Sequence, residues 1–163
     1  MNSGLDGWNL HPVGHSPPLG SGYPKRILIV DPEDTLTWSL SRGLFRNHPD
    51  FRVLVAHQGT EALHLLKKEP IDLLLSEVKL PDFHWLDFLE KVVHLSPQAR
   101  VIFMASYGYQ ELEALARERG IKDWITKPFE IATLRETIAH SLDAPTTVSS
   151  RNSSGLWSSS SYF

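Results

Sequence analysis

The sequence predicts an α/β fold in which a doubly wound parallel sheet of five strands is covered by helices on both faces. Two observations predict it. Short apolar runs alternate along the chain with segments whose apolar residues recur at three- and four-residue steps, and such alternation requires right-handed crossovers between parallel strands. The first, third and fourth runs are apolar almost throughout, as expected of strands that are buried on both faces.

Each element is predicted from its own pattern. The predicted strands are residues 26–30, 51–56, 71–76, 101–105 and 123–125. The predicted helices are lined, in order, by Leu36, Leu40 and Leu44; by Ala62, Leu63 and Leu66; by Leu86, Leu89 and Val93; by Leu112, Leu115 and Ala116; and by Ile131, Leu134, Ile138 and Leu142. Asp34 and Thr60 stand near the starts of the first two helices and are predicted N-caps.

One folded unit is predicted over residues 25–142, because the composition changes on either side of it. Residues 1–24 contain five glycines and show no periodicity, which is typical of a disordered leader. Residues 143–163 contain eight serines, which is typical of a disordered tail.

Composition and charge exclude several classes of function. The net charge of −3 argues against a nucleic-acid partner. Cysteine is absent, so disulfides and thiol catalysis are excluded, and a reducing cytoplasm is the expected location. No apolar run is long enough to span a membrane, and the eight histidines show no paired metal-ligand spacing. We therefore expect a cytoplasmic protein without a nucleic-acid or membrane partner.

Two acids are expected at one edge of the sheet. In doubly wound sheets, ligands bind at the carboxyl ends of the strands, near the point where the strand order reverses. Asp31 follows the first predicted strand, and Glu77 follows the third. These two carboxylates are the first candidates for a functional site.

Four segments in register resemble the receiver domains of response regulators, of the chemotaxis-regulator type. They are Ile27–Asp31, Ile71–Pro81, Val101–Gly108 and Asp123–Phe129, and the resemblance covers about residues 25–142. It implies the (βα)5 flavodoxin-like fold with strand order 2-1-3-4-5. It also implies a non-enzymatic signalling domain of bacterial two-component phosphorelays.

The five groups that carry the family's chemistry are only partly retained. In the family, two acids after the first strand help to hold Mg²⁺, and an aspartate after the third strand accepts phosphate from a histidine kinase. A hydroxyl after the fourth strand and a lysine after the fifth bind the phosphoryl group. Asp31 and Lys127 match this pattern, whereas Pro32, Glu77 and Ala105 stand in place of the second acid, the aspartate and the hydroxyl.

Three neighbouring residues are candidates to contribute to the site where the family's groups are missing. Glu33 is close to Asp31 and is expected to be a solvated loop acid. Ser106 lies one residue after the hydroxyl position and should face the other side of the strand unless a bulge turns it. Lys79 either adds a second cation beside Glu77 or extends into solvent.

Lys127 and its neighbours complete the predicted pocket. Without a phosphoryl group to bind, Lys127 is expected to pair with Glu77 and Asp31. The Lys127-Pro128 bond resembles the family's cis peptide. Trp124 takes the place of the family's switch aromatic, and we expect it to be permanently packed beside Ala105.

These departures predict a degenerate pseudo-receiver, a phosphorylation-independent regulator or adaptor that binds protein partners. Glu77 is either a fixed mimic of the phosphorylated state or a residue that has drifted without consequence. No cofactor is expected, and Mg²⁺ should bind weakly if at all, through Asp31 and Glu77.

The resemblance also implies a docking face, formed by the fourth helix, the fifth strand and the fifth helix, which could also support a homodimer. Its candidate exposed residues are Glu111, Glu113, Arg117, Lys122 and Arg135. Two alternatives stay open. The chain could be a working phosphorelay receiver, or a scaffold whose terminal segments bind partners through Trp8, Trp157, Tyr162 and Phe163.

Overall fold

The computed structural model describes residues 23–45 and 50–143, over which strands and helices alternate as predicted. The elements are β1 (Lys25–Val30), α1 (Asp34–Phe45), β2 (Phe51–Ala56), α2 (Gly59–Lys68), β3 (Leu73–Glu77), α3 (Trp85–Leu95), β4 (Arg100–Ser106), α4 (Gln110–Glu118), β5 (Asp123–Lys127) and α5 (Ile131–Asp143). Nearly all of the predicted leader and tail lies outside the described residues, including Trp8, Trp157, Tyr162 and Phe163. Over the described part of the chain, no helix is long and apolar enough to cross a bilayer.

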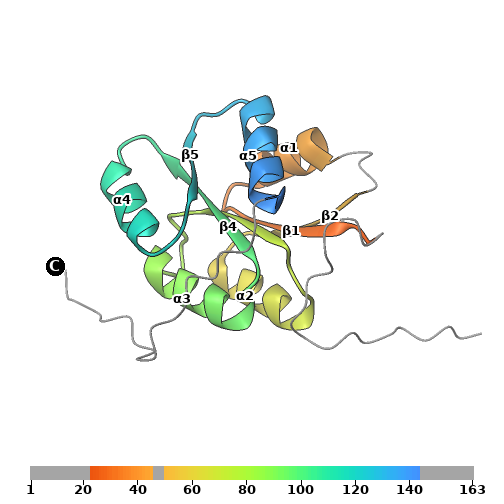
Figure 1. The fold of residues 1–163 in the computed structure, drawn as a ribbon, viewed down its shortest axis with the longest axis horizontal. Coiled ribbons are helices and arrows are strands. Elements are labelled where there is room, and N and C mark those ends of the chain that lie inside the picture. The colour runs from red at the N-terminus through yellow and green to blue at the C-terminus, as the bar shows by residue number, and fades with distance from the viewer. Residues whose placement is uncertain (1–22, 46–49, 144–163) are drawn as a thin grey trace, which may run out of the picture.

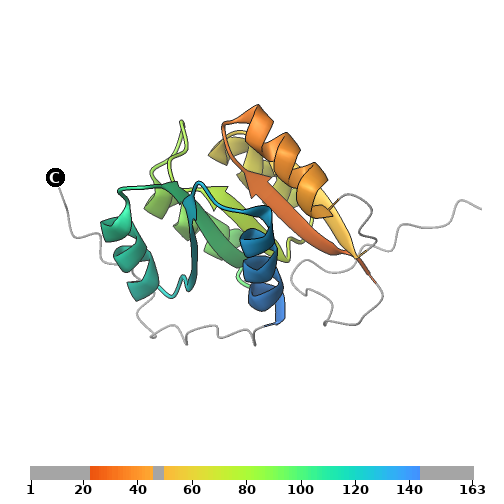
Figure 2. The same ribbon diagram turned by 90° about the horizontal axis from the view of Figure 1, so that it is seen from above.

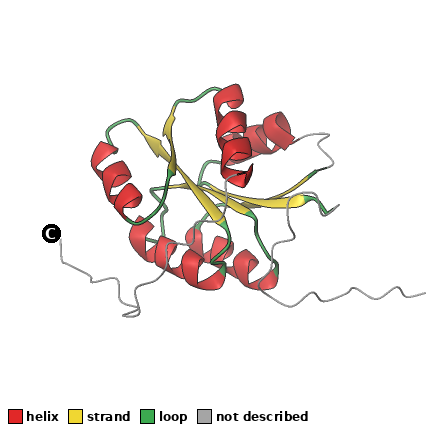
Figure 3. Cartoon of the chain, in the orientation of Figure 1, coloured by secondary structure: helices red, strands yellow, loops and turns green. Residues whose placement is uncertain are grey.

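The five strands form one parallel sheet in the order β2-β1-β3-β4-β5, so the predicted topology is confirmed. Helices cover both faces: α1 and α5 lie on one side of the sheet, and α2 and α3 on the other (Figures 1 and 3). In the view from above, α1 and α5 are seen on their common face of the sheet (Figure 2). The strand order reverses between β1 and β3, which places their carboxyl ends side by side.

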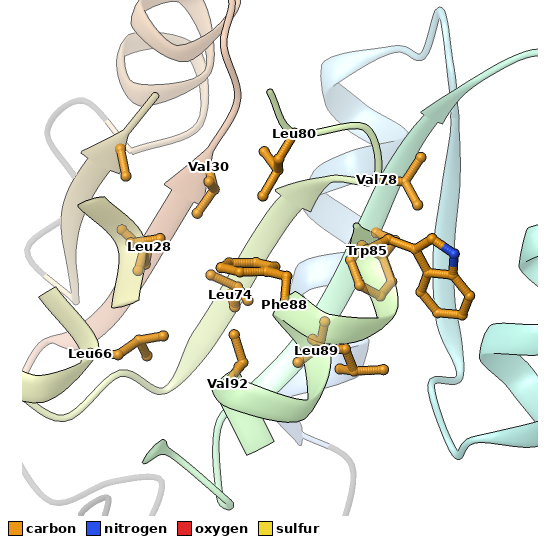
Figure 4. Close-up of a cluster of buried hydrophobic side chains, with 14 of the residues drawn as sticks. Leu28, Val30, Leu66, Leu74, Val78, Leu80, Trp85, Phe88, Leu89 and Val92 are labelled. Atoms are coloured by element: carbon orange, nitrogen blue, oxygen red, sulfur yellow. The ribbon is translucent and has the colours of Figure 1, made fainter. Parts of the chain in front are cut away.

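Alternate residues of the central strands enter two separate cores. Ile27 and Ile29 of β1 are buried against α1 and α5, whereas Leu28 and Val30 are buried against α2 and α3. Figure 4 shows this second core, in which Phe88 of α3 packs between the sheet and its own helix. Each large apolar side chain buried in this way stabilises the fold by roughly 1.5–3 kcal/mol.

The buried faces of α3 and α4 differ in part from the prediction. The predicted Leu89 of α3 is buried, and the predicted Leu86 and Val93 are partly buried against the same core. The prediction left out Trp85, Phe88 and Val92, which are also buried on this face. Leu115 of α4 is exposed, and only Ala116 of that helix is fully buried.

Both predicted N-caps are wrong, because each residue is itself helical. Asp34 is the first residue of α1, and its carboxylate lies 3.3 Å from Nδ1 of His57. Thr60 is the second residue of α2, and Gln58, at the N-cap position, makes no side-chain cap.

Asp82 supplies the missing cap of α2 from the loop between β3 and α3. Its carboxylate accepts hydrogen bonds from the N–H groups of Gly59 and Thr60, both at 2.8 Å, and from the Thr60 hydroxyl at 2.6 Å. Burial alone would raise the pKa of Asp82, but these hydrogen bonds together outweigh it and hold the pKa below its ordinary value of 3.8. The loop that follows Glu77 is thereby tied to the start of α2.

Gly59 is required for this close approach. A Cβ atom at Gly59 would lie 2.5 Å from Cδ2 of Phe83 and 3.2 Å from Cδ2 of Phe88. Any side chain there would push the β3–α3 loop away from α2.

We predict that Gly59→Ala destabilises the protein by about 1–3 kcal/mol, because the added methyl group overlaps Phe83. Gly43→Ala is the matched control, since its Cβ would meet Ile131 at an ordinary 3.7 Å within α1. That change should be stabilising by up to about 1 kcal/mol. Denaturant unfolding of both variants measures the difference, and a neutral Gly59→Ala would contradict the close approach.

We also predict that Asp82→Ala costs about 1 kcal/mol at neutral pH, as for a lost N-cap. Because the folded pKa of Asp82 is lowered, its contribution is present above pH 3.8 and is lost as the pH falls through the folded value. The stability difference between wild type and Asp82→Ala should therefore shrink in acid. Thermal unfolding over a pH series tests this, with Glu90→Ala as the control for an exposed acid of α3. A difference that persists below the folded pKa would contradict the role of the carboxylate.

Candidate functional site

The candidate site lies where the strand order reverses, at the carboxyl edge of the sheet. Asp31 directly follows β1, Glu77 is the last residue of β3, and Lys127 is the last residue of β5. Asp31 and Glu77 are buried, with 2% and 8% of their surface exposed. Lys127 is half-buried, and its side chain retains 20% exposure.

Lys127 joins the two acids. Its Nζ lies 2.7 Å from Oδ2 of Asp31 and 2.5 Å from Oε2 of Glu77. The second oxygen of Asp31 accepts a hydrogen bond from the Glu33 N–H at 2.9 Å, and the second oxygen of Glu77 accepts one from the Lys79 N–H at 3.1 Å. The expected contact between Lys127 and Glu77 is present, and each carboxylate oxygen has a donor.

The charge of Lys127 is stabilised by this arrangement. Burial alone would lower the pKa of Lys127, but the hydrogen bonds and negative charges of Asp31 and Glu77 outweigh it and raise the pKa above its ordinary value of 10.5. The ammonium group is therefore charged throughout the neutral pH range.

The residues present do not fit a Mg²⁺ ion. Mg²⁺ requires near-octahedral oxygen ligands, and Pro32 offers no side-chain oxygen. The ammonium group of Lys127 already bonds one oxygen of Asp31 and one of Glu77. Within residues 23–45 and 50–143, no three His, Cys, Asp or Glu side chains are grouped so that they could hold a metal.

Ser106 does not supply the missing hydroxyl on the face of β4 that carries Ala105. Ala105 is fully buried, and Ser106 is exposed. The pairing of β4 with β5 runs without interruption from Ile102 to Ser106, so no bulge turns Ser106 toward the face of Ala105.

Glu33 is a solvated loop acid, as expected, and Lys79 extends into solvent, which was one of its two predicted positions. Both are exposed, and both contribute backbone N–H groups to the site. In the described part of the chain, the Lys79 side chain forms no ion pair, so it adds no second cation to Glu77. The Lys127-Pro128 peptide bond is cis, as expected.

Trp124 is packed, but its main partner is one that sequence reasoning missed. Its indole is half-buried, and its centroid lies 6.0 Å from that of Phe103, with the rings inclined at 57°. Phe103 and Trp124 are paired residues of β4 and β5. The sequence showed an aromatic residue in each strand, and only the register of the sheet shows that they meet.

Four of the five docking-face candidates are exposed: Glu111, Arg117, Lys122 and Arg135. Glu113 is half-buried and therefore differs from the prediction. Its carboxylate binds Nη2 of Arg117 at 2.7 Å, and Nη1 of Arg117 reaches the carbonyl of Lys122 at 3.2 Å. These contacts connect α4 with the segment that enters β5.

Comparison with known proteins matches residues 27–139 to the family described as the response regulator receiver domain. The chain is 35% identical over 118 residues to the response regulator protein PilR of Pseudomonas aeruginosa, which covers 72% of this chain and 26% of PilR. It is 29% identical over 119 residues to the chemotaxis protein CheY of Bacillus subtilis, which covers 72% of this chain and 98% of CheY. The chain thus spans about a quarter of the first relative and nearly all of the second.

A solved structure shows the same fold. The CheY-like response regulator receiver domain protein from Methanospirillum hungatei JF-1 aligns with a TM-score of 0.68 at 31% sequence identity. The alignment covers 74% of this chain and 94% of that chain.

We predict that Lys127→Met destabilises the protein by about 2–3 kcal/mol at neutral pH, because it leaves two buried carboxylates without their cation. Adding Glu77→Gln to Lys127→Met should recover part of that loss, since one of the two charges is then removed. Lys79→Met, at an exposed lysine nearby, should change the stability by less than about 0.5 kcal/mol.

Denaturant unfolding of the four proteins measures these differences. Because the folded pKa of Lys127 is raised, its contribution is present below its ordinary pKa of 10.5 and is lost as the pH rises through the folded value. A Lys127→Met variant that loses no more stability than Lys79→Met would refute the role of the cluster.

Proposed function

The chain belongs to the response regulator receiver domain family, and we propose that it is a pseudo-receiver, a phosphorylation-independent signalling regulator or adaptor that acts through protein–protein contacts. Receiver domains are generally non-enzymatic signalling domains that interact with kinases and other proteins. The observation that carries the proposal is the Lys127 ammonium group, which is bonded to both Glu77 and Asp31. The group that would receive a phosphoryl oxygen is already satisfied by the protein.

Three replacements act on different parts of phosphoryl transfer. Pro32 removes an oxygen that would help to hold the metal, and Ala105 removes a donor for the phosphoryl oxygens. The extra methylene of Glu77 moves the attacking oxygen by about 1 Å, a displacement that can lower the rate about 10²-fold. Losses of groups that act as a unit do not add, so repair of one group restores little.

The contact between Glu77 and Lys127 favours the interpretation of Glu77 as a fixed mimic of the phosphorylated state over that of a residue that has drifted without consequence. The carboxylate extends to the cation that a phosphoryl group would otherwise bind, at 2.5 Å. In our proposal, Glu77 is therefore a fixed stand-in for the phosphorylated state. Mg²⁺ binds weakly at most, because it must compete with Lys127 for the same oxygens.

The proposed docking face is formed by α4, β5 and α5. Glu111 and Arg117 present opposite charges on α4, and Arg135 lies on α5, where it also reaches the carbonyl of Gly43 at 3.1 Å. A protein partner with complementary charges, or a second copy of this chain, would bind here in the cytoplasm.

The decisive experiment is incubation with acetyl phosphate and Mg²⁺ followed by intact mass measurement. Three proteins are compared: wild type, Glu77→Asp, and the triple variant Pro32→Asp, Glu77→Asp, Ala105→Thr. We expect no added phosphoryl group on wild type and none on Glu77→Asp, because the metal ligand and the hydroxyl are still missing. If phosphate is taken up at all, we expect it on the triple variant alone.

Circular dichroism and thermal unfolding of each variant show that an unmodified protein is folded. Stoichiometric phosphorylation of the wild type that maps to Glu77 would overturn the proposal and establish a working phosphorelay receiver.

A further inference from the structure

Three aromatic side chains form a continuous row across one face of the sheet, and we call them the ring row. The row consists of Trp85 at the start of α3, Phe103 in β4 and Trp124 in β5. Trp85 and Phe103 meet edge to face, with centroids 6.0 Å apart and planes at 89°. Phe103 and Trp124 are likewise 6.0 Å apart, at 57°. Both are favourable geometries for aromatic pairs.

The middle ring is enclosed on all sides. Phe103 is fully buried, and its backbone pairs with Ser76 of β3 on one side and with Trp124 of β5 on the other. Trp85 is 5% exposed, and Figure 4 shows it at the start of α3, close to Val78 of the β3–α3 loop. Because protein interiors are close-packed, Trp124 cannot move toward the sheet unless Phe103 and then Trp85 move as well.

The outer end of the ring row supports the proposed docking face. Trp124 and two residues of α4, Leu112 and Ala116, pack against the same core. Ile121, which leads into β5, packs there too. Trp124, the inner side of α4 and the residue that leads into β5 therefore share one apolar core.

We propose that the ring row is a conformational lock that holds Trp124 in one position and so gives the α4–β5 surface a single conformation. This inference deepens the proposed function and rests on it for its biological meaning, since a regulator that is not switched needs a surface with one state. The lock itself is a property of the three rings. It requires nothing from Glu77 or Lys127.

The test is ¹⁹F NMR of the full chain labelled with 5-fluorotryptophan. The protein contains five tryptophans, and loss of one signal in Trp124→Phe assigns the resonance of Trp124. We expect one sharp Trp124 line in the wild type. In Phe103→Leu, which removes the middle ring, we expect exchange broadening or a second Trp124 line with about a tenth or more of the intensity.

Ile102→Val is the matched control. Ile102 precedes Phe103 in β4 and is equally buried, but it faces the opposite core with α1 and α5. It should lower the stability and leave the single Trp124 line unchanged. Trp38 on α1 is 61% exposed and serves as an internal reference whose line should not respond in either variant.

Two results would overturn the lock: two exchanging Trp124 lines in the wild type, or a single unchanged line in folded Phe103→Leu. If Phe103→Leu does not fold, Trp85→Phe decides, because it shortens the far end of the row and keeps an aromatic ring. A second Trp124 line in that variant supports the lock, and an unchanged single line refutes it. Phosphate uptake is measured separately, so failure of the lock and failure of the pseudo-receiver proposal are distinguishable.

Discussion

The ammonium group of Lys127 is the constraint on which the site depends. It bonds residues that lie 96 and 50 positions earlier in the chain, at 2.7 Å and 2.5 Å, and so joins the ends of β1, β3 and β5. Neighbouring strands are about 4.8 Å apart, so β3 and β5 are separated by roughly 10 Å across β4. Only a long side chain can bridge that distance, and a lysine facing a glutamate supplies the reach from both sides.

Glu77 stands where the family has an aspartate. In our proposal, its extra methylene group displaces the oxygen that would attack a phosphoryl group. Its carboxylate accepts hydrogen bonds from the Lys127 ammonium group and from the Lys79 N–H. Removal of Lys127 would leave buried carboxylates without their cation, which costs more than the pair contributes when intact.

The sheet and the site could be predicted from the sequence because both depend on local patterns. Apolar runs locate the strands, and the acids and the lysine that follow them meet because the carboxyl ends of parallel strands share an edge. The cap from Asp82 could not be predicted in this way, since it joins residues 22 and 23 positions apart through a loop with no regular pattern. The place of Trp85 on the inner face of α3 was missed for a related reason. Its ring meets Phe103 of β4, which lies in another element.

The Lys127 cluster and the ring row are stabilised by different kinds of interaction. The features that bear on phosphoryl chemistry are therefore separate from those that bear on the conformation of the α4–β5 surface. The Lys127 cluster is electrostatic and partly exposed, so it responds to pH and to the charge of its members. The ring row is apolar and depends on packing, so it responds to the size and shape of its members. Restoring an aspartate, a metal ligand and a hydroxyl would alter the first and leave the second in place. A receiver needs a phosphoryl acceptor and also a surface with two accessible conformations, and in our proposals this chain lacks the two through different residues.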